Sequence, residues 1–306
     1  MRIIKKTNID FLGKINITTL LSFFLISGGI ISMVLNGGPK LSIDFKGGTL
    51  VAVNYTAPVN IEKIRSELGS VQIDGQSFNF SNAEIKYFGD ESNIAVRIAS
   101  MEEEPEQFSK KFSDKLASIF PDLVPVDKNN FILSVEKVGP KVGAELSSDA
   151  LMAILSALFL ILIYVSVRFE FKYAVGAIAA LVHDVLITLG VFSILGYEVS
   201  LAVIAAFLTI VGYSLNDTIV IFDRVRENVK TTKNAPMKNI INQSINESLS
   251  RTIITSLTTF FVVLILFLFG GEVIHTFSFA MIVGVLIGTY SSIFVASPVV
   301  IKMDSK

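Results

Sequence analysis

Long apolar runs alternate with shorter polar segments along this chain. Each run holds roughly 20 residues, the length that an α-helix needs to cross the hydrocarbon core of a bilayer. The runs span residues 15–35, 150–167, 173–195, 199–222, 252–269 and 276–297. The first run is too long for the apolar part of a secretory signal, and no small-x-small cleavage pattern follows it. The pattern therefore predicts a multi-pass α-helical membrane protein with six transmembrane helices.

Residues 36–149, between the first two runs, are polar and acidic and have a periodicity of their own. Alternating apolar residues favour strands at 49–56, 84–88, 93–99 and 131–138, and helical spacing favours helices after Asn60 and over 108–119. The order β-α-β-β-α-β predicts a small α+β ferredoxin-like domain. Residues 70–83 receive no element, although Asp74-Gly75 suits the turn of a small hairpin.

Lysine and arginine residues set the predicted orientation. Among the short segments outside the runs, they lie in residues 1–14, between the second and third runs, in residues 223–251 and in residues 302–306, whereas the short segments around Glu198 and Glu272 carry none. Positive charge favours the cytoplasmic side. We therefore predict two cytoplasmic termini, a periplasmic (extracytoplasmic) domain at 36–149, and a five-helix transmembrane domain at 150–301 with a cytoplasmic loop at 223–251.

The loop at 223–251 contains a further helical pattern. Asn234-Ala-Pro236 is typical of a helix N-cap and first turn, and apolar residues follow at near-helical spacing: Met237, Ile241, Ile245 and Leu249. Two interpretations stay open. The segment is either an amphipathic helix lying on the membrane or a loop helix packed on the ends of the transmembrane helices.

Composition removes several classes of function. The chain is 51% hydrophobic and 17% charged, with a mean hydropathy of +0.62, which is more apolar than an ordinary soluble domain. It has no cysteine and only two histidines, His183 and His275, so Cys-based and His-rich metal sites are excluded. A net charge of -1 argues against nucleic-acid binding. No phosphate-binding loop or nucleophile–base pair is found, so we expect neither an enzyme nor a cofactor.

Asp217 is the most unusual residue in the apolar runs. It lies beside Asn216 and six residues before Asp223, which places it roughly 9 Å inside the cytoplasmic boundary of its helix. A carboxylate in mid-membrane costs about 3 kcal/mol on insertion scales. Since aspartate is too short to reach the surface, it must face protein or a water-filled cleft, and such carboxylates usually mark ion pathways.

Arg251, at the border of the fifth run, is the natural partner for Asp217 in the same leaflet. One helical face continues from it through Thr255, Thr258 and Thr259, whose hydroxyls are able to carry a hydrogen-bond chain. The alternative is that Arg251 extends to the lipid headgroups and that the threonines bond to their own helix.

A second polar pair, His183 and Asp184, lies near the centre of the third run. Asp184 shares a face with small and polar residues suited to close helix contact, namely Gly176, Ala180 and Thr188. Asp184 either belongs to a proton path or is a structural hydrogen-bond partner for the fourth helix, and the structural role is slightly favoured. A stripe in the sixth run, Ala280, Gly284, Gly288 and Ser292, predicts packing alone.

Four stretches together resemble the SecF family, within the SecD/SecF proteins of the resistance-nodulation-division superfamily. They are "IDFKGGTL" at 43–50, "VGPKVGAEL" at 138–146, "GYSLNDTIVIFDRVREN" at 212–228 and "SLSRTIITSLTT" at 248–259. The last two are highly specific in combination. The first also occurs in the partner family SecD, and the short domain at 36–149 favours SecF.

The resemblance implies a function in protein export at the bacterial inner membrane. A member of this family pairs with SecD, works with the SecYEG channel and uses the proton-motive force to move preproteins, with the proton gradient and no cofactor as its energy source. Asp217, Arg251 and Thr255 match the family's proton-pathway residues, and Asn216 adjoins them. Asp217 would be ionised near Arg251 and protonated when the two separate. Gly139, Pro140 and Gly143 are then either a hinge or a plain connector.

Two other functions stay open at this stage. The chain is alternatively half of a proton-driven exporter of small molecules or lipids from the same superfamily, although such exporters have much larger exterior domains. It is otherwise a passive subunit that stabilises its partner.

Overall fold

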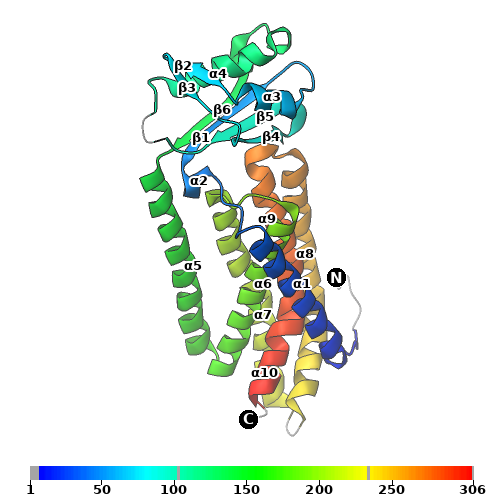
Figure 1. The fold of residues 1–306 in the computed structure, drawn as a ribbon. Coiled ribbons are helices and arrows are strands. Elements are labelled where there is room, and N and C mark those ends of the chain that lie inside the picture. Colours follow the sequence, from blue (N-terminus) through cyan, green and yellow to red (C-terminus); the bar gives the residue numbers. More distant parts are fainter. Residues whose placement is uncertain (1–6, 102–103, 233–234, 305–306) are drawn as a thin grey trace. The chain divides into compact units, whose positions relative to one another are not determined.

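The computed structural model describes residues 7–101, 104–232 and 235–304, and the chain folds into two compact units. One unit contains the chain up to residue 40 and from residue 150 onward, and it is helical; the other contains residues 41–149 and holds a β-sheet (Figure 1).

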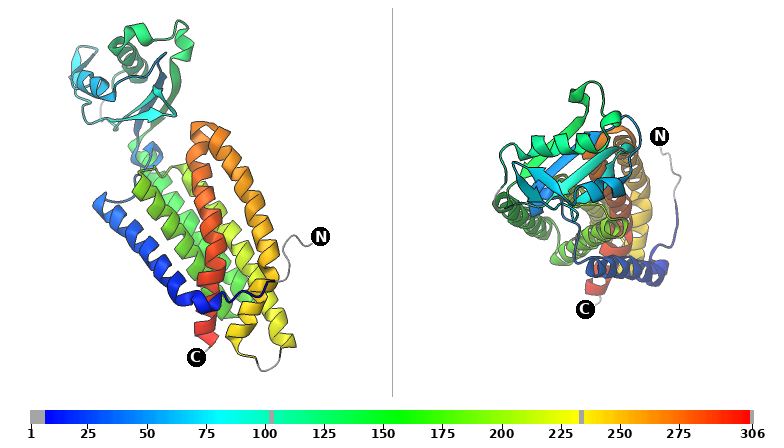
Figure 2. Two further views of the ribbon diagram at one scale, coloured as in Figure 1. Left: turned by 90° about the vertical axis from the view of Figure 1, so that its right-hand side faces the viewer. Right: turned by 45° about the horizontal axis from the view of Figure 1, so that its top comes forward.

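The unit at 41–149 is an antiparallel sheet covered by two helices. Its four strands, β1 (Gly48–Asn54), β4 (Glu84–Phe88), β5 (Asp90–Ile98) and β6 (Ile132–Val138), are arranged in the order β4-β5-β1-β6. Helix α3 (Ile61–Glu67) follows β1, and α4 (Phe108–Ile119) follows β5. Every neighbouring pair is antiparallel. The predicted β-α-β-β-α-β ferredoxin-like arrangement is confirmed, and Figure 2 shows it from two further directions.

The core of this unit lies between one face of the sheet and the two helices. Val51, Val53 and Tyr55 alternate inward from β1 and the residue after it, opposite Phe112 of α4, and all four are buried. The Tyr55 hydroxyl donates to the Leu116 carbonyl at 2.8 Å, and burial raises the pKa of this phenol well above its ordinary value. The apolar residues whose spacing predicted these elements thus form the core of the unit.

A small hairpin occupies the segment that received no predicted element. Strands β2 (Val71–Ile73) and β3 (Gln76–Phe78) pair antiparallel. Asp74 and Gly75 both have positive φ, 53° and 78°, as a two-residue type I′ turn requires. The turn chemistry of Asp-Gly therefore indicated the hairpin correctly.

Short elements join the sheet to its flanking segments. Helix α2 (Ile43–Lys46) is capped by the Ser42 side chain, and two short 3₁₀ turns, η2 (Pro121–Leu123) and η3 (Lys128–Asn130), precede β6. In the first turn of α5, a Cβ on Gly143 would lie 2.8 Å from the Phe45 carbonyl oxygen. The two glycine-containing stretches at 43–50 and 138–146 therefore pack backbone against backbone.

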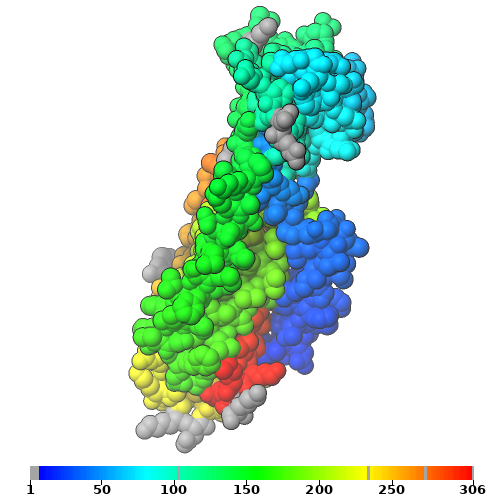
Figure 3. Space-filling view, turned by 60° about the vertical axis from the view of Figure 1, so that its left-hand side comes forward, coloured from blue at the N-terminus to red at the C-terminus, as the bar shows by residue number. Residues whose placement is uncertain are grey.

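In the described part of the chain, six helices are long and apolar enough to cross a membrane, as predicted. They are α1 (Ile15–Leu35, after the 3₁₀ turn η1 at Leu12–Lys14), α5 (Pro140–Arg168), α6 (Phe171–Leu195), α7 (Leu201–Thr231), α8 (Met237–Phe269), and α9 (Gly271–Ser291), which continues through a π turn, η4 (Ser292–Ala296), into α10 (Ser297–Asp304). Little of α5 is buried, and it covers one side of the molecule in Figure 3.

Several helices extend beyond the apolar runs, α5 and α7 among them. Helix α5 begins at Pro140 and not at residue 150, and α7 continues to Thr231, beyond residue 222. The added turns hold mostly charged and small polar residues, which end a run of hydropathy without ending a helix, since Glu, Lys and Arg favour helices. Pro140 is the first residue of α5, where proline is favoured. Of the predicted hinge or connector residues, only Gly139 lies outside the helix.

The loop helix at 237–249 is the first part of α8, and it is not a separate helix on the membrane surface. Its apolar residues Ile241, Ile245 and Leu249 are buried in one core cluster with Phe222 and Val225 of α7. That apolar face is covered by protein and unavailable to lipid, so packing on the helix ends is the correct interpretation. Pro236 occupies the N-cap position, and Asn234, the predicted cap, lies outside the described residues.

Two asparagines one turn apart on α8 hold the segment before α1. Asn246 Oδ1 accepts from the Ile9 N–H at 2.8 Å, and Asn242 Oδ1 accepts from the Phe11 N–H at 2.9 Å. Both side-chain amides donate to the Ile9 carbonyl. Leu12 is buried in the core cluster of this unit. This contact was not predicted from the sequence.

Close helix contacts in this unit occur at small residues. A Cβ on Gly29 of α1 would lie 2.7 Å from the Gly190 Cα of α6, and one on Gly288 of α9 would lie 2.9 Å from the Ser214 Cβ of α7. Gly284 likewise faces Ile210. Without a hydrophobic driving force between helices in lipid, such close approach gives the van der Waals and polar contacts that hold them together.

We predict that residues 41–149 fold when expressed alone and that Phe112→Ala destabilises them by about 3–5 kcal/mol, because it leaves a cavity in the core. Chemical denaturation followed by circular dichroism measures this change. Lys110→Ala, at an exposed position of the same helix, is the matched control and should change stability little. A disordered spectrum for the wild-type segment would show that the unit does not fold independently.

Candidate functional site

Asp217 is buried in the middle of the helical bundle. Helix α7 begins after Ser200, whose hydroxyl accepts from the Val203 N–H, and it carries Asp217 to a position where the residue is only 1% exposed. Asp217 Oδ2 accepts from Ser256 Oγ of α8 at 3.4 Å, and Ser256 Oγ lies 2.7 Å from Thr289 Oγ1 of α9. We call Asp217, Ser256 and Thr289 the Asp217 site.

Arg251 does not contact Asp217, although both residues are in the described part of the chain. Its side chain is exposed, and no hydrogen bond or ion pair within 4 Å joins the two. The two charges interact only through space. The direct pairing expected from the sequence is therefore not present in this structure, because Arg251 lies on the outer side of α8 while Ser256 is the residue that faces α7.

The other predicted pathway residues are not gathered around the carboxylate either. Thr255 Oγ1 donates to the Arg251 and Thr252 carbonyls, and Thr258 Oγ1 donates to those of Ile254 and Thr255. Both threonines thus bond to their own helix, the alternative weighed from the sequence. Thr259 is half-buried, and Asn216 is exposed on α7.

Two further hydroxyls lie one helical turn from the Asp217 site. Tyr213 precedes Asp217 by four residues on α7, and Thr252 precedes Ser256 by four residues on α8. Their hydroxyl oxygens are buried and have no hydrogen-bond partner among the described residues. A buried unpaired hydroxyl costs about 1–3 kcal/mol, so these two groups are available to a water or a transferring proton.

Asp184 is also buried, but it is fully bonded. Its Oδ2 accepts from Ser214 Oγ of α7 at 2.6 Å and from Ser291 Oγ of α9 at 2.8 Å, while Oδ1 lies 3.0 Å from His183 Nδ1. One carboxylate therefore joins three helices. This geometry favours the structural role for Asp184, with partners on α9 as well as on the fourth helix.

The sequence analysis missed Ser256, Thr289, Ser214 and Ser291. One signal was present: Thr289-Tyr290-Ser291-Ser292 is a run of four polar residues inside an otherwise apolar helix. The helix also changes there, since the π turn starts at Ser292. Pro298, which follows that turn, has no N–H to give to the preceding turn. The Ser297 hydroxyl donates to the Ser292 carbonyl at 3.1 Å.

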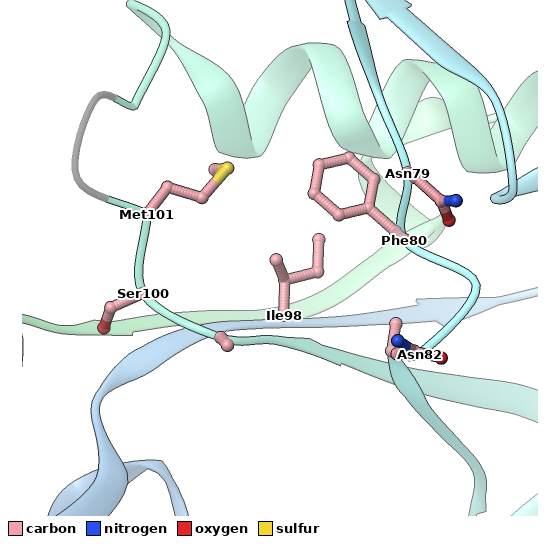
Figure 4. A pocket seen from close by; sticks show the side chains of 8 residues that line it. Asn79, Phe80, Asn82, Ile98, Ser100 and Met101 are labelled. Carbon is pink, nitrogen blue, oxygen red and sulfur yellow. The ribbon is translucent and has the colours of Figure 1, made fainter.

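A shallow cavity of about 230 Å³ lies in the unit at 41–149. It is lined by Asn79, Phe80, Asn82, Ala83, Ile98, Ala99, Ser100 and Met101, and Figure 4 shows these side chains around it. None of the lining residues is titratable, so the cavity offers no acid–base chemistry. No cluster of three His, Cys, Asp or Glu side chains able to hold a metal is found in the described parts of either unit.

Comparison with known proteins matches the chain over nearly its whole length. The family described as Protein export membrane protein SecD/SecF, C-terminal, matches residues 121–306. Protein translocase subunit SecF of Calditerrivibrio nitroreducens is 47% identical, with 98% of this chain and 95% of that protein covered. The protein of the same name from Thermodesulfovibrio yellowstonii is 42% identical, with 99% and 97% covered.

Solved structures agree with the sequence matches. The crystal structure of SecDF, a translocon-associated membrane protein from Thermus thermophilus, has a TM-score of 0.85 and 36% identity over 98% of this chain. The chain spans 39% of the length of that solved chain. SecDF in its super-membrane-facing form has a TM-score of 0.68 and 35% identity. On its sequence, its two-unit fold and its membrane helices, this chain belongs to the SecF family of the SecD/SecF protein export membrane proteins.

Proposed function

We propose that this chain is the SecF-type subunit of the protein-export machinery, which pairs with SecD and uses proton movement through Asp217 to promote preprotein passage through SecYEG. Relatives named protein translocase subunit SecF support the export role. The name of the solved structure, SecDF, supports SecD as the partner subunit of this chain. The exporter alternative gains no support from these matches.

One observation carries the proposal: a carboxylate buried in a membrane-spanning helix has one long hydrogen bond and no contacting cation. Asp217 accepts only from Ser256, at 3.4 Å, among the described residues. Ionised carboxylates in such surroundings are costly, whereas the protonated form is neutral. A residue under this constraint binds and releases a proton more readily than one saturated with donors, so Asp217 is suited to carry protons.

The two hydroxyls beside Asp217 are able to serve both of its protonation states. Thr289 Oγ1 donates to the Val285 carbonyl at 2.8 Å, which leaves Ser256 as donor to Thr289 and lets a protonated Asp217 donate to Ser256. When Asp217 is ionised, Ser256 turns its proton to the carboxylate and Thr289 turns its own to Ser256. Rotation of two hydroxyls thus follows the charge of Asp217 without movement of a helix.

The unpaired hydroxyls give the path a direction. With both termini in the cytoplasm, α7 runs inward and α8 runs outward. Tyr213 then lies on the periplasmic side of Asp217 and Thr252 on the cytoplasmic side, each about 6 Å along its helix. Protons entering by Tyr213 and leaving by Thr252 pass Asp217 between them. A membrane potential provides about 2.3 kcal/mol per charge for each 100 mV.

Arg251 acts on Asp217 from a distance in this scheme. It is exposed at the cytoplasmic part of α8, where an arginine can reach water along its aliphatic stem. When the side chain turns inward, it favours the ionised carboxylate and release of the proton; when it turns outward, it favours proton uptake. Thr255 and Asn216 stay secondary members of the pathway, and the energy source is the proton gradient with no cofactor.

Replacement of Asp217 by Asn should abolish gradient-dependent export while the complex still assembles, because the amide keeps the shape and the Ser256 contact but cannot titrate. The measurement is preprotein translocation into vesicles, with and without a proton gradient, at matched subunit levels. Asp223→Asn, at a half-exposed position on the same helix, is the control and should retain the gradient effect. Normal gradient-dependent export by Asp217→Asn would exclude the carrier role, and loss of assembly with it would favour a passive subunit.

Arg251→Met should also stop gradient-dependent export, since Asp217 loses the cation that favours proton release. If the two residues act as one unit, the double variant should be no worse than either single variant. Arg226→Met, which removes an exposed arginine from α7, serves as the control in the same vesicle assay. Additive losses in the double variant would show that the two residues act independently.

The proposed orientation predicts which positions a membrane-impermeant thiol reagent reaches. The chain has no cysteine of its own, so single cysteines report cleanly. A cysteine at Asp90, in the sheet unit, should be labelled from outside the inner membrane, and one at Lys230, at the end of α7, only after the membrane is opened. Labelling at Lys230 in intact cells would reverse the topology and with it the direction of the path.

A further inference from the structure

A chain of hydrogen bonds runs from Asp184 to α1. Asp184 Oδ1 lies 3.0 Å from His183 Nδ1, and His183 Nε2 lies 2.9 Å from Ser22 Oγ. Ser22 Oγ lies 3.0 Å from Tyr290 Oη, which donates to the Thr18 carbonyl at 2.7 Å. His183 is 5% and Asp184 is 1% exposed. We call these groups the His183 chain.

The directions of the bonds from His183 to Thr18 follow from the last acceptor, the Thr18 carbonyl. The Thr18 carbonyl cannot donate, so the single hydroxyl proton of Tyr290 goes to it. Tyr290 Oη must then accept from Ser22, and Ser22 Oγ must accept in turn from His183. His183 therefore carries a proton on Nε2.

The contact between His183 and Asp184 needs a proton of its own. With Nε2 protonated, the 3.0 Å contact between Nδ1 and Oδ1 is a hydrogen bond only if a proton sits on one of those two atoms. Either the imidazole is doubly protonated beside a carboxylate, or a neutral imidazole accepts from a protonated Asp184. Both forms have the same number of protons, and in both the pair has no net charge.

We propose that His183 and Asp184 form a second buried proton-binding site, distinct from Asp217, whose bound proton orders the hydrogen bonds that join α6 to α1. Release of that proton leaves an Asp184 carboxylate and a neutral imidazole with its proton on Nδ1. Nε2 then has a lone pair facing Ser22, Ser22 turns its hydroxyl proton toward it, and the contact between Ser22 and Tyr290 has no proton left to fill it.

The groups around the pair match this assignment. Asp184 Oδ2 accepts two hydroxyls, from Ser214 of α7 and Ser291 of α9, so both hydroxyl protons go to the oxygen that does not face His183. Tyr290 of α9, whose ring stacks on His183, is the one other titratable group facing the pair in the described structure. From α1, the residue that contacts the pair is Ser22. Asp217 of α7 lies a turn beyond Ser214 and faces Ser256 of α8 and not the pair.

The site lies on the contact that attaches α1 to the bundle. Ser22 faces His183, a Cβ added to Gly29 would lie 2.7 Å from the Gly190 Cα, and Ser32 Oγ lies 2.9 Å from Ser193 Oγ. Each pair has the same offset in sequence, as two parallel helices in register require. The proton on the His183 pair therefore determines how α1 is bonded to α6 at Ser22.

This inference concerns α6 and α1 and holds whether or not Asp217 is the carrier, and its test reads a protonation state and not export. The full chain, purified with its partner subunit in lipid nanodiscs, is labelled with isotopically enriched histidine and studied by nuclear magnetic resonance. The chain has two histidines, so a His275→Gln variant leaves His183 as the sole signal; comparison with His183→Gln assigns it independently. We expect Nε2 to be protonated near neutral pH. A neutral ring with its proton on Nδ1 alone would overturn the proposal.

Two matched variants test the chain of bonds. Ser22→Ala removes the acceptor for Nε2–H and should shift the His183 signals toward the Nδ1–H form. Ser32→Ala removes a hydroxyl contact between the same two helices and should leave them unchanged. Equal shifts in both variants, or none in Ser22→Ala, would show that the chain does not order the proton.

Asp184→Asn imitates the protonated His183–Asp184 pair with a hydrogen that the side chain does not release. Its amide oxygen accepts from Ser214 and Ser291 while its NH₂ group donates to His183 Nδ1, so every contact survives without a releasable proton. We expect a neutral His183 with its proton on Nε2, unchanged as pH rises, whereas in the wild type the Nε2–H signal is lost at high pH. Loss of that signal at the same pH in both proteins would contradict a proton held by the pair.

Discussion

Polar groups within the bilayer must find their partners inside the protein, and this constraint organises the helical unit. No water in the hydrocarbon region replaces a missing hydrogen bond, so each buried carboxylate or hydroxyl is satisfied by a neighbouring helix or is costly. The small residues that line the helix contacts make this possible. Gly29, Gly190 and Gly288 bring the backbones close enough for short serine and threonine side chains to reach across.

The two buried aspartates satisfy the constraint in different ways. Asp184 is saturated: it receives two serine hydroxyls on one oxygen and lies against His183 on the other. Among the described residues, Asp217 has one long bond to Ser256, and hydroxyls without a partner lie one turn away on either helix. The saturated carboxylate holds helices together, and its charge is compensated locally. The undersatisfied one is the group whose protonation changes at least cost, which is the property that a proton carrier needs.

The two sites are close along the chain and share helices. Ser214, a partner of Asp184, lies one turn from Asp217 on α7, and Ser291 lies two residues from Thr289 on α9. A π turn follows Ser291, and the Ser297 hydroxyl donates to the Ser292 carbonyl across it. A rotation of α7 or α9 would change the Asp184 bonds, and through His183 and Ser22 the bonds to α1. If Asp217 carries protons as proposed, these bonds connect its two neighbouring helices to α1.

The sequence alone determined the helices and strands, but not which side chains on different elements contact each other. Hydropathy identified the six helices, alternation and turn chemistry identified the ferredoxin-like unit with its Asp74-Gly75 hairpin, and the cost of a buried charge singled out Asp217 and Asp184. These features depend on one residue and its neighbours in the chain. The ends of α5 and α7, the burial of Ile241 and Ile245, and the choice of Ser256 over Arg251 as the contact of Asp217 were decided by tertiary structure. Which of several polar residues on α8 faces α7 depends on the rotation and approach of two helices. Those are set by packing at small residues far along the sequence, so no local pattern reports them.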